Sequence, residues 1–232
     1  MPNPGSFLPS SDGFAFTNAW PSEPAVTLPT PFGQINIGNA AAGLCGGMVF
    51  AALDYWHAGI PAPAARPGPA QPLYHFLVRR LVDSWHVPAG VAQYYQWMNL
   101  PDADTGFDAF GHRIIIERGL AWRTIRVQLP AVRADLDKGL PVPLGIVTAA
   151  SANPADLALN HQVLAYRYEA DDDVVTLRVY DPNRGPRDDA SLRFSVSEPT
   201  KRTVFRHNLG LDPPVRGFFR TPYLPALPPR SM

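Results

Sequence analysis

The chain of 232 residues has a single cysteine, no excess of either charge and no long apolar run. One cysteine cannot form an internal disulfide, so the cysteine content assigns no redox compartment, and a secreted protein could carry such a free thiol. The 20 basic and 20 acidic side chains cancel, and no basic block occurs, so we expect no binding to nucleic acid or to a membrane. The sequence contains no run of about 18 apolar residues, so it predicts no transmembrane helix.

Metal and nucleotide motifs are missing as well. The sequence has no pair of cysteines, no His-Glu-x-x-His and no glycine-rich phosphate loop, so we expect no metal and no cofactor. Residues 181–185 start like a calcium loop, but the glycine at its sixth position and the glutamate at its twelfth are missing. The first residues lack the basic and apolar regions of a signal peptide, so we expect a soluble protein, either cytoplasmic or exported as an effector.

Proline, by contrast, is abundant. The 27 prolines are about twice the usual share, and they gather at both ends and in residues 61–72. We interpret residues 1–33 as an extended arm that its Phe and Trp side chains anchor to the domain. Residues 222–232 form a Pro-rich tail, of which 222–229 should be exposed polyproline-like coil. Residues 34–221 are then expected to form one domain.

The hydrophobic pattern places helices first and strands later. A helix should begin at Cys45 and end at Gly59, because its apolar positions follow a helical period. Together with this helix, three more predicted helices complete a helical half at about 43–120: Leu73–Trp85, Val91–Met98 and Phe107–Arg118.

The sheet half is expected at about 121–221. It contains one short predicted helix, Ala131–Lys138, and seven predicted strands: Thr124–Gln128, Val142–Thr148, His161–Tyr168, Val174–Tyr180, Ser191–Val196, Lys201–Arg206 and Val215–Arg220. Helices followed by a sheet are typical of the α+β class.

Cys45 stands in the sequence Gly-Leu-Cys-Gly-Gly-Met, at the start of an apolar helix. A helix N-terminus presents unpaired N–H groups and a partial positive charge, which favour the reactive thiolate. Gly43, Gly46 and Gly47 carry no side chain, so we expect them to let a substrate backbone approach the sulfur. Cys45 is therefore a candidate nucleophile.

A nucleophilic thiol needs a base, and His161 is the best candidate. If the turn between the two strands that follow centres on Asp171, His161 lies opposite Asp181 and Val163 lies opposite Val179. This register places an apolar stripe on the same face: Val163, Ala165, Val175, Leu177 and Val179. Asp181 would then orient His161, and Asn183, two residues further on, is the alternative orienting residue.

An oxyanion hole needs hydrogen-bond donors near the reacting carbonyl. The backbone N–H of Cys45 is one candidate. For a side-chain donor we consider Asn39, six residues before Cys45, and Gln34, eleven residues before it.

Three segments resemble the papain-like cysteine peptidase superfamily: residues 43–48, 160–166 (Asn-His-Gln-Val-Leu-Ala-Tyr) and 179–183 (Val-Tyr-Asp-Pro-Asn). The similarity is closest to the bacterial branch that includes bacteriocin-leader-processing peptidases, and it covers about 34–185. In that superfamily the thiol begins a long helix, and the histidine and its Asn or Asp partner lie on adjacent strands of a twisted antiparallel sheet. The site cleft lies between the helical half and the sheet.

The resemblance implies that Cys45, His161 and Asp181 form a catalytic triad. A Gln or Asn shortly before the cysteine commonly completes the oxyanion hole, which Asn39 matches by spacing and Gln34 by residue type. The chain lacks the Cys-Gly-Ser-Cys-Trp signature of papain itself.

The expected function is therefore hydrolysis of a peptide or isopeptide bond in a peptide or protein substrate, through a thioester acyl-enzyme. The same triad serves deamidation, transglutamination and acyl transfer, because only the acceptor of the acyl group changes. A catalytically silent binding module, presenting its Pro-rich termini to partners, is the alternative of a different class.

Overall fold

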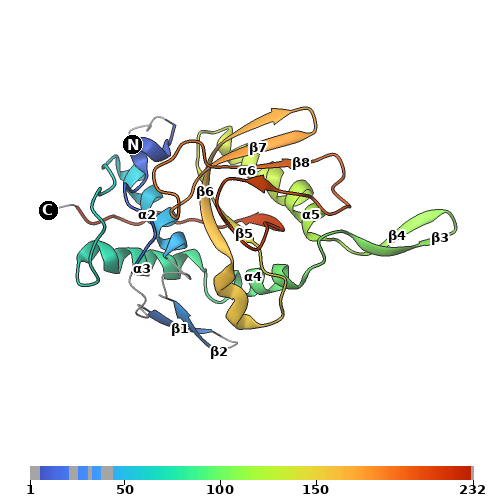
Figure 1. The fold of residues 1–232 in the computed structure, drawn as a ribbon, viewed down its shortest axis with the longest axis horizontal. Coiled ribbons are helices and arrows are strands. Elements are labelled where there is room, and N and C mark those ends of the chain that lie inside the picture. Colours follow the sequence, from blue (N-terminus) through green and yellow to red (C-terminus); the bar gives the residue numbers. More distant parts are fainter. Residues whose placement is uncertain (1–5, 21–25, 31–32, 38–43, 231–232) are drawn as a thin grey trace.

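The protein is a mixed helix and sheet structure of the α+β class (Figure 1). The computed structural model describes residues 6–20, 26–30, 33–37 and 44–230, and for 26–30 and 33–37 it describes the backbone. The helical elements are α1 (Pro9–Asp12), α2 (Cys45–Ala58), α3 (Pro72–Ser84), α4 (Ala89–Asn99), α5 (Leu120–Trp122), η1 (Arg123–Gln128), α6 (Leu129–Leu136) and η2 (Pro154–Leu159).

A six-stranded antiparallel sheet forms the centre, in the order β10-β5-β6-β7-β8-β9. Its strands are β5 (Val142–Val147), β6 (His161–Asp171), β7 (Val174–Tyr180), β8 (Ser191–Ser195), β9 (Arg206–His207) and β10 (Gly217–Arg220). Two hairpins lie outside it: β1 (Val26–Thr30) with β2 (Gly33–Ile37), and β3 (Thr105–Ala109) with β4 (His112–Glu117).

Two apolar cores form on the two faces of the sheet. Helices α2, α3 and α4 pack with Leu164 and Tyr180 in one core. The second core joins α6 to the predicted apolar stripe, all five members of which are buried there. The alternation along β6 and β7 thus divides their side chains between the two cores.

Helix α2 is the most buried helix, since every residue from Gly46 to Trp56 is buried. A Cβ atom on Gly47 would overlap the carbonyl oxygen of Leu77 on α3, and one on Gly46 would overlap Ser84 Oγ and Gln162 Oε1. The expectation that these two glycines admit a substrate is therefore wrong: they admit the neighbouring helix and strand. Gly43 lies outside the described residues.

Most predicted elements are present, including the α2 helix and its end at Gly59, which has φ +65°. The helix predicted over Phe107–Arg118 is wrong, because this segment is the β3–β4 hairpin, which projects from the body (Figure 1). Phe110 and Gly111 have φ of +52° and +77°, the conformation of a tight two-residue hairpin turn.

The strand predicted over Thr124–Gln128 is also wrong, because η1 and α6 form one continuous helical segment. Ile125, Leu129 and Val132 recur at helical spacing and are buried in the same core, whereas Val127 is exposed. The strand predicted over Lys201–Arg206 is reduced to β9, Arg206–His207.

The N-terminal arm is anchored by aromatic side chains as expected, since Phe7, Phe14, Phe16 and Trp20 are buried. It also contains the single turn α1, which the expected extended arm lacked.

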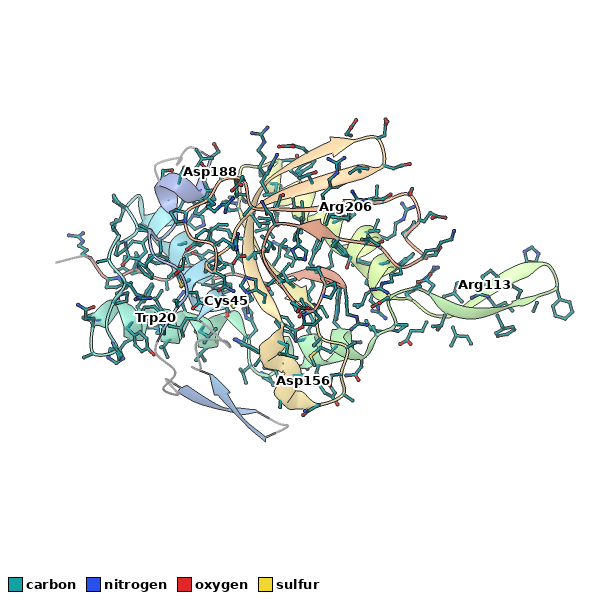
Figure 2. All side chains as sticks on the ribbon, in the orientation of Figure 1. Trp20, Cys45, Arg113, Asp156, Asp188 and Arg206 are labelled. Carbon is teal, nitrogen blue, oxygen red and sulfur yellow. The ribbon has the colours of Figure 1, made fainter. Side chains whose placement is uncertain are left out.

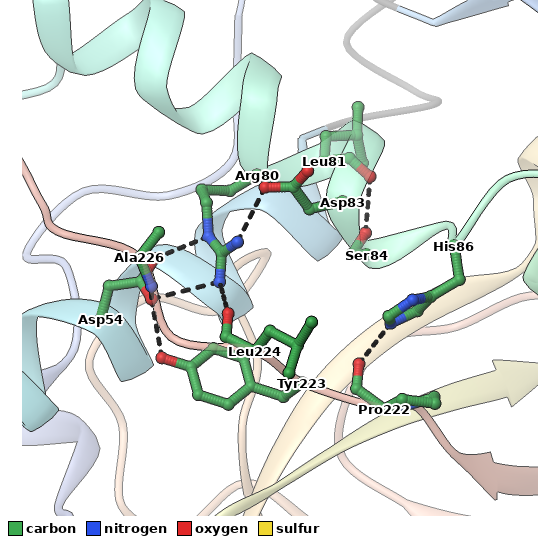
Figure 3. Close-up of polar contacts among 10 residues, drawn as sticks. All are labelled: Asp54, Arg80, Leu81, Asp83, Ser84, His86, Pro222, Tyr223, Leu224 and Ala226. Atoms are coloured by element: carbon green, nitrogen blue, oxygen red, sulfur yellow. Dashed lines mark hydrogen bonds and ion pairs between the residues drawn. The ribbon is translucent and has the colours of Figure 1, made fainter.

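The C-terminal tail is more tightly held than expected for exposed coil (Figure 3). Asp54 Oδ1 on α2 accepts hydrogen bonds from Tyr223 Oη at 2.7 Å and from Ala226 N at 2.8 Å. Arg80 Nη2 on α3 donates to the Leu224 carbonyl at 2.8 Å, and Arg80 Nε lies 2.6 Å from Asp54 Oδ2. Both charged side chains are buried, so the tail closes over an ion pair.

We predict that Arg80→Met lowers the free energy of unfolding by about 3–5 kcal/mol, because it leaves the Asp54 carboxylate buried without its cation. Urea denaturation measures the effect. The exposed ion pair of Arg113 with Asp108 is the control, and Arg113→Met should cost under about 1 kcal/mol. Equal costs for the two variants would contradict the assignment.

We also predict that Gly47→Ala destabilises the protein by about 1–3 kcal/mol, since the new methyl group meets backbone of α3. Helix propensity alone would give the opposite sign, because alanine is favoured over glycine by about 1 kcal/mol. Gly68→Ala, where a Cβ would meet only Gln71 Oε1, at 4.0 Å, should change stability by less than about 0.5 kcal/mol. A stabilised Gly47→Ala protein would show that the α2–α3 contact is looser than described.

Candidate active site

Cys45 is the first residue of α2 and is half-buried in the body of the protein, far from the projecting hairpin that carries Arg113 (Figure 2). Leu44 is the N-cap residue, and no side chain caps the helix from that position. The first N–H groups of a helix have no partner within it. The sulfur therefore lies at the positive end of a buried helix dipole.

His161 is the first residue of β6, and the preceding turn fixes where the strand begins. Asn160 Oδ1 accepts a hydrogen bond from Thr148 N at 3.1 Å, and Asn160 Nδ2 donates to the Leu157 carbonyl at 3.2 Å. These bonds tie the end of β5 and the short helix η2 to the start of β6. His161 then pairs with Ile146 in the sheet.

Asp181 follows β7 directly, and its carboxylate contacts the imidazole of His161. His161 Nε2 lies 2.8 Å from Asp181 Oδ1, and both side chains are buried, with 5% and 0% of their surface exposed. Asp181 Oδ1 also accepts the N–H of Asn183 at 2.9 Å, which closes a local turn. The predicted contact between His161 and Asp181 is confirmed.

The register that produces this contact differs from the predicted one. Val179 pairs with Ala165, not with Val163, and the turn falls between Asp171 and Val174. That turn alone would put His161 and Asp181 on opposite faces of the sheet. A β-bulge between Ala165 and Arg167 adds one residue to β6, which returns His161 and Asp181 to the same face of the sheet. When the register is continued, the two residues are diagonal neighbours, which side chains of this length can bridge.

The charges at this site favour a protonated imidazole. Burial lowers the pKa of His161, but the Asp181 carboxylate and the Cys45 sulfur outweigh burial and raise it to about 10, through charge and through hydrogen bonds. Because Asp181 occupies Nε2, Nδ1 is the ring nitrogen left for the sulfur. The arrangement stabilises the imidazolium form of His161 beside the Asp181 carboxylate.

The other predicted site residues have mixed outcomes. Asn183 does not orient His161: its side-chain oxygen accepts a hydrogen bond from Asn18 Nδ2 at 2.9 Å. Gln34 pairs with Pro29 in the β1–β2 hairpin, and its side chain is not described. Asn39 lies outside the described residues. The oxyanion donors therefore stay a prediction.

Three buried residues near the site were missed from the sequence: Asn18, Tyr94 and Gln162. Tyr94 Oη donates to the His161 carbonyl at 3.2 Å, and burial, reinforced by the Cys45 sulfur, raises the pKa of Tyr94 well above its usual value. Gln162 lies against Gly46 at the start of α2. Only adjacency to His161 could have singled out Gln162, and no sequence signal marks the other two.

Grooves and metal sites give no further guide to the chemistry. A groove of about 970 Å³ runs between the arm and β6–β7, lined by Phe7 and Tyr168 among others, but Cys45 and His161 do not line it. Within the described part of the chain, no cluster of three or more His, Cys, Asp or Glu side chains could hold a metal ion. None of the helices described there has the length and apolar character needed to cross a membrane.

Comparison of the chain with protein-family models, with curated proteins and with solved structures finds no match.

We predict that the stability difference between the wild type and His161→Gln depends on pH. The pKa of His161 is higher in the folded protein, at about 10, than in the unfolded chain, at about 6.5. The imidazolium contact is therefore lost as the pH rises toward 10, and the loss, about 1 kcal/mol per pH unit, is read between pH 8 and pH 10, where an ordinary thiol ionises in the unfolded chain as well.

Urea denaturation at pH 6, 8 and 10 measures this difference. His75→Gln, at an exposed position on α3, is the control. A difference that does not fall between pH 8 and pH 10 would rule out the imidazolium pair.

Proposed function

We propose that the protein is a cysteine-dependent hydrolase with a papain-like architecture. The observation that carries the proposal is the buried 2.8 Å contact between His161 and Asp181, with Cys45 at the N-terminus of α2 near enough for its sulfur to raise the pKa of the same imidazole. A buried His–Asp ion pair beside a half-buried thiol is costly for folding and adds little stability, whereas it is the arrangement that a thiol nucleophile requires. The chain order Cys, His, Asp is that of the papain-like superfamily.

The proposed first step is attack of the Cys45 thiolate on a carbonyl carbon, which forms a C–S bond and a tetrahedral oxyanion. The N–H of Cys45 is positioned to donate to that oxyanion, and Asn39 or Gln34 is the proposed side-chain donor. His161 then gives its proton to the leaving amine as the C–N bond breaks, and a thioester remains. Asp181 holds the ring and balances its charge in the imidazolium state.

In the second step neutral His161 takes a proton from water, and the resulting hydroxide adds to the thioester. The C–S bond then breaks, the acid product leaves, and the thiolate and imidazolium are restored. Peptide or isopeptide hydrolysis is the favoured reaction. A substrate amine in place of water would give transglutamination, and a side-chain amide in place of the peptide bond would give deamidation.

We predict that iodoacetamide labels Cys45 rapidly at pH 6, because a thiolate paired with imidazolium persists there. In His161→Gln the labelling rate at pH 6 should fall by at least about tenfold. The rate of this variant should increase only as the pH approaches about 8.5, the ordinary pKa of a thiol. Cys45 is the only cysteine, so mass spectrometry of the intact chain reports one thiol. His75→Gln should label like the wild type.

The proposal would be contradicted if the wild type is labelled only near pH 8.5. It would also be contradicted if the wild type and His161→Gln are labelled equally at pH 6. The reaction type is then read from a peptide library incubated with the wild type and with Cys45→Ala. New termini, the small mass gain of deamidation and cross-linked products separate the three reactions.

A further inference from the structure

Asn18 on the N-terminal arm joins the two backbone segments that carry Cys45 and Asp181. Its Oδ1 accepts the N–H of Leu44 at 2.9 Å, and its Nδ2 donates to Asn183 Oδ1 at 2.9 Å. Its own N–H donates to the carbonyl of Pro182, also at 2.9 Å. Asn18 is 8% exposed, so its bond to the Leu44 N–H forms away from bulk water, whereas its partner Asn183 is exposed.

Each partner of Asn18 is one or two residues from a member of the triad. Leu44 directly precedes Cys45 and is the N-cap of α2. Pro182 and Asn183 directly follow Asp181, and the N–H of Asn183 returns to the Asp181 carboxylate. The side chain of Asn18, more than twenty residues before Cys45, thus bridges helix α2 and the turn that follows Asp181.

The amide is suited to this place because it donates and accepts at once. Leu44 is 2% exposed, and its N–H is one of the groups that a helix start leaves without an intrahelical partner. An apolar side chain at position 18 would leave that N–H buried and unpaired, and it would release the Asn183 side chain. Either segment could then shift relative to the other.

We propose that Asn18 is a positioning residue that sets the separation between Cys45 and the His161–Asp181 pair, an inference that rests on the proposed function. Asn18 acts through Leu44 and Asn183. Its effect should be large because displacements on the order of 1 Å in a catalytic arrangement reduce rates strongly.

The test compares iodoacetamide labelling of Cys45 at pH 6 and pH 9 in the wild type and in Asn18→Leu, which is similar in shape but cannot form hydrogen bonds. Positioning predicts a fall of about tenfold or more at pH 6, and little change at pH 9, where thiols form thiolate without a partner. A residue that only stabilises the fold would change the urea midpoint and leave the ratio of the two rates unchanged.

Asn208→Leu is the control for the hydrogen-bonding pattern, at an exposed position. Asn208 also accepts one hydrogen bond, from Ser191 N, and donates one, to the Asp189 carbonyl, but its partners belong neither to α2 nor to the Asp181–Asn183 turn. This variant should keep the wild-type ratio of rates. If Asn18→Leu is folded by near-ultraviolet circular dichroism and keeps that ratio as well, the positioning role is overturned.

If Asn18→Leu does not fold, two variants at the exposed Asn183 decide. Asn183→Leu removes the acceptor of Asn18 Nδ2, whereas Asn183→Asp keeps an oxygen there. The inference expects loss of labelling at pH 6 in the first and retention in the second, and any other pattern overturns it. A wild type without reactivity at pH 6 would instead refute the proposed function, and the inference would fall with it.

Discussion

Helix α2 is buried along eleven consecutive residues, and the rest of the structure depends on this constraint. A helix with no solvated face must be covered on every side, and here α3, β6, the N-terminal arm and the C-terminal tail supply the cover. Two glycines in its first turn let α3 and β6 approach closely. The helix reaches the surface only at its two ends, at Cys45 and at His57 and Ala58.

Burial of α2 leaves polar groups that need hydrogen-bond partners, and residues from distant parts of the chain supply them. Its N-terminal N–H groups need acceptors, and Asn18 supplies one to Leu44. The Asp54 carboxylate in its middle needs donors, which Arg80, Tyr223 and the Ala226 N–H supply. Asn18 of the N-terminal arm and Tyr223 and Ala226 of the C-terminal tail are therefore tied to the helix that carries Cys45.

The candidate site was largely predictable because its three members carry local signals. Cys45 starts an apolar helix between glycines, His161 begins one strand, Asp181 directly follows the next, and both strands have a clear apolar alternation. The predicted register was nevertheless wrong, and the contact exists because a bulge at Tyr166 offsets a shifted turn. A bulge has no pattern of its own in the sequence, since it depends on how neighbouring strands twist and pack.

Local chemistry in the sequence was enough to place the helix of Cys45, the central strands and the α+β class, because periodicity and turn residues act over a few positions. Packing in three dimensions decided the rest. Ile125 belongs to a helix because its face meets the core, and residues 107–118 pair as a hairpin. Asn18 reaches the site through hydrogen bonds across 26 and 165 residues of chain, a separation that no local pattern records.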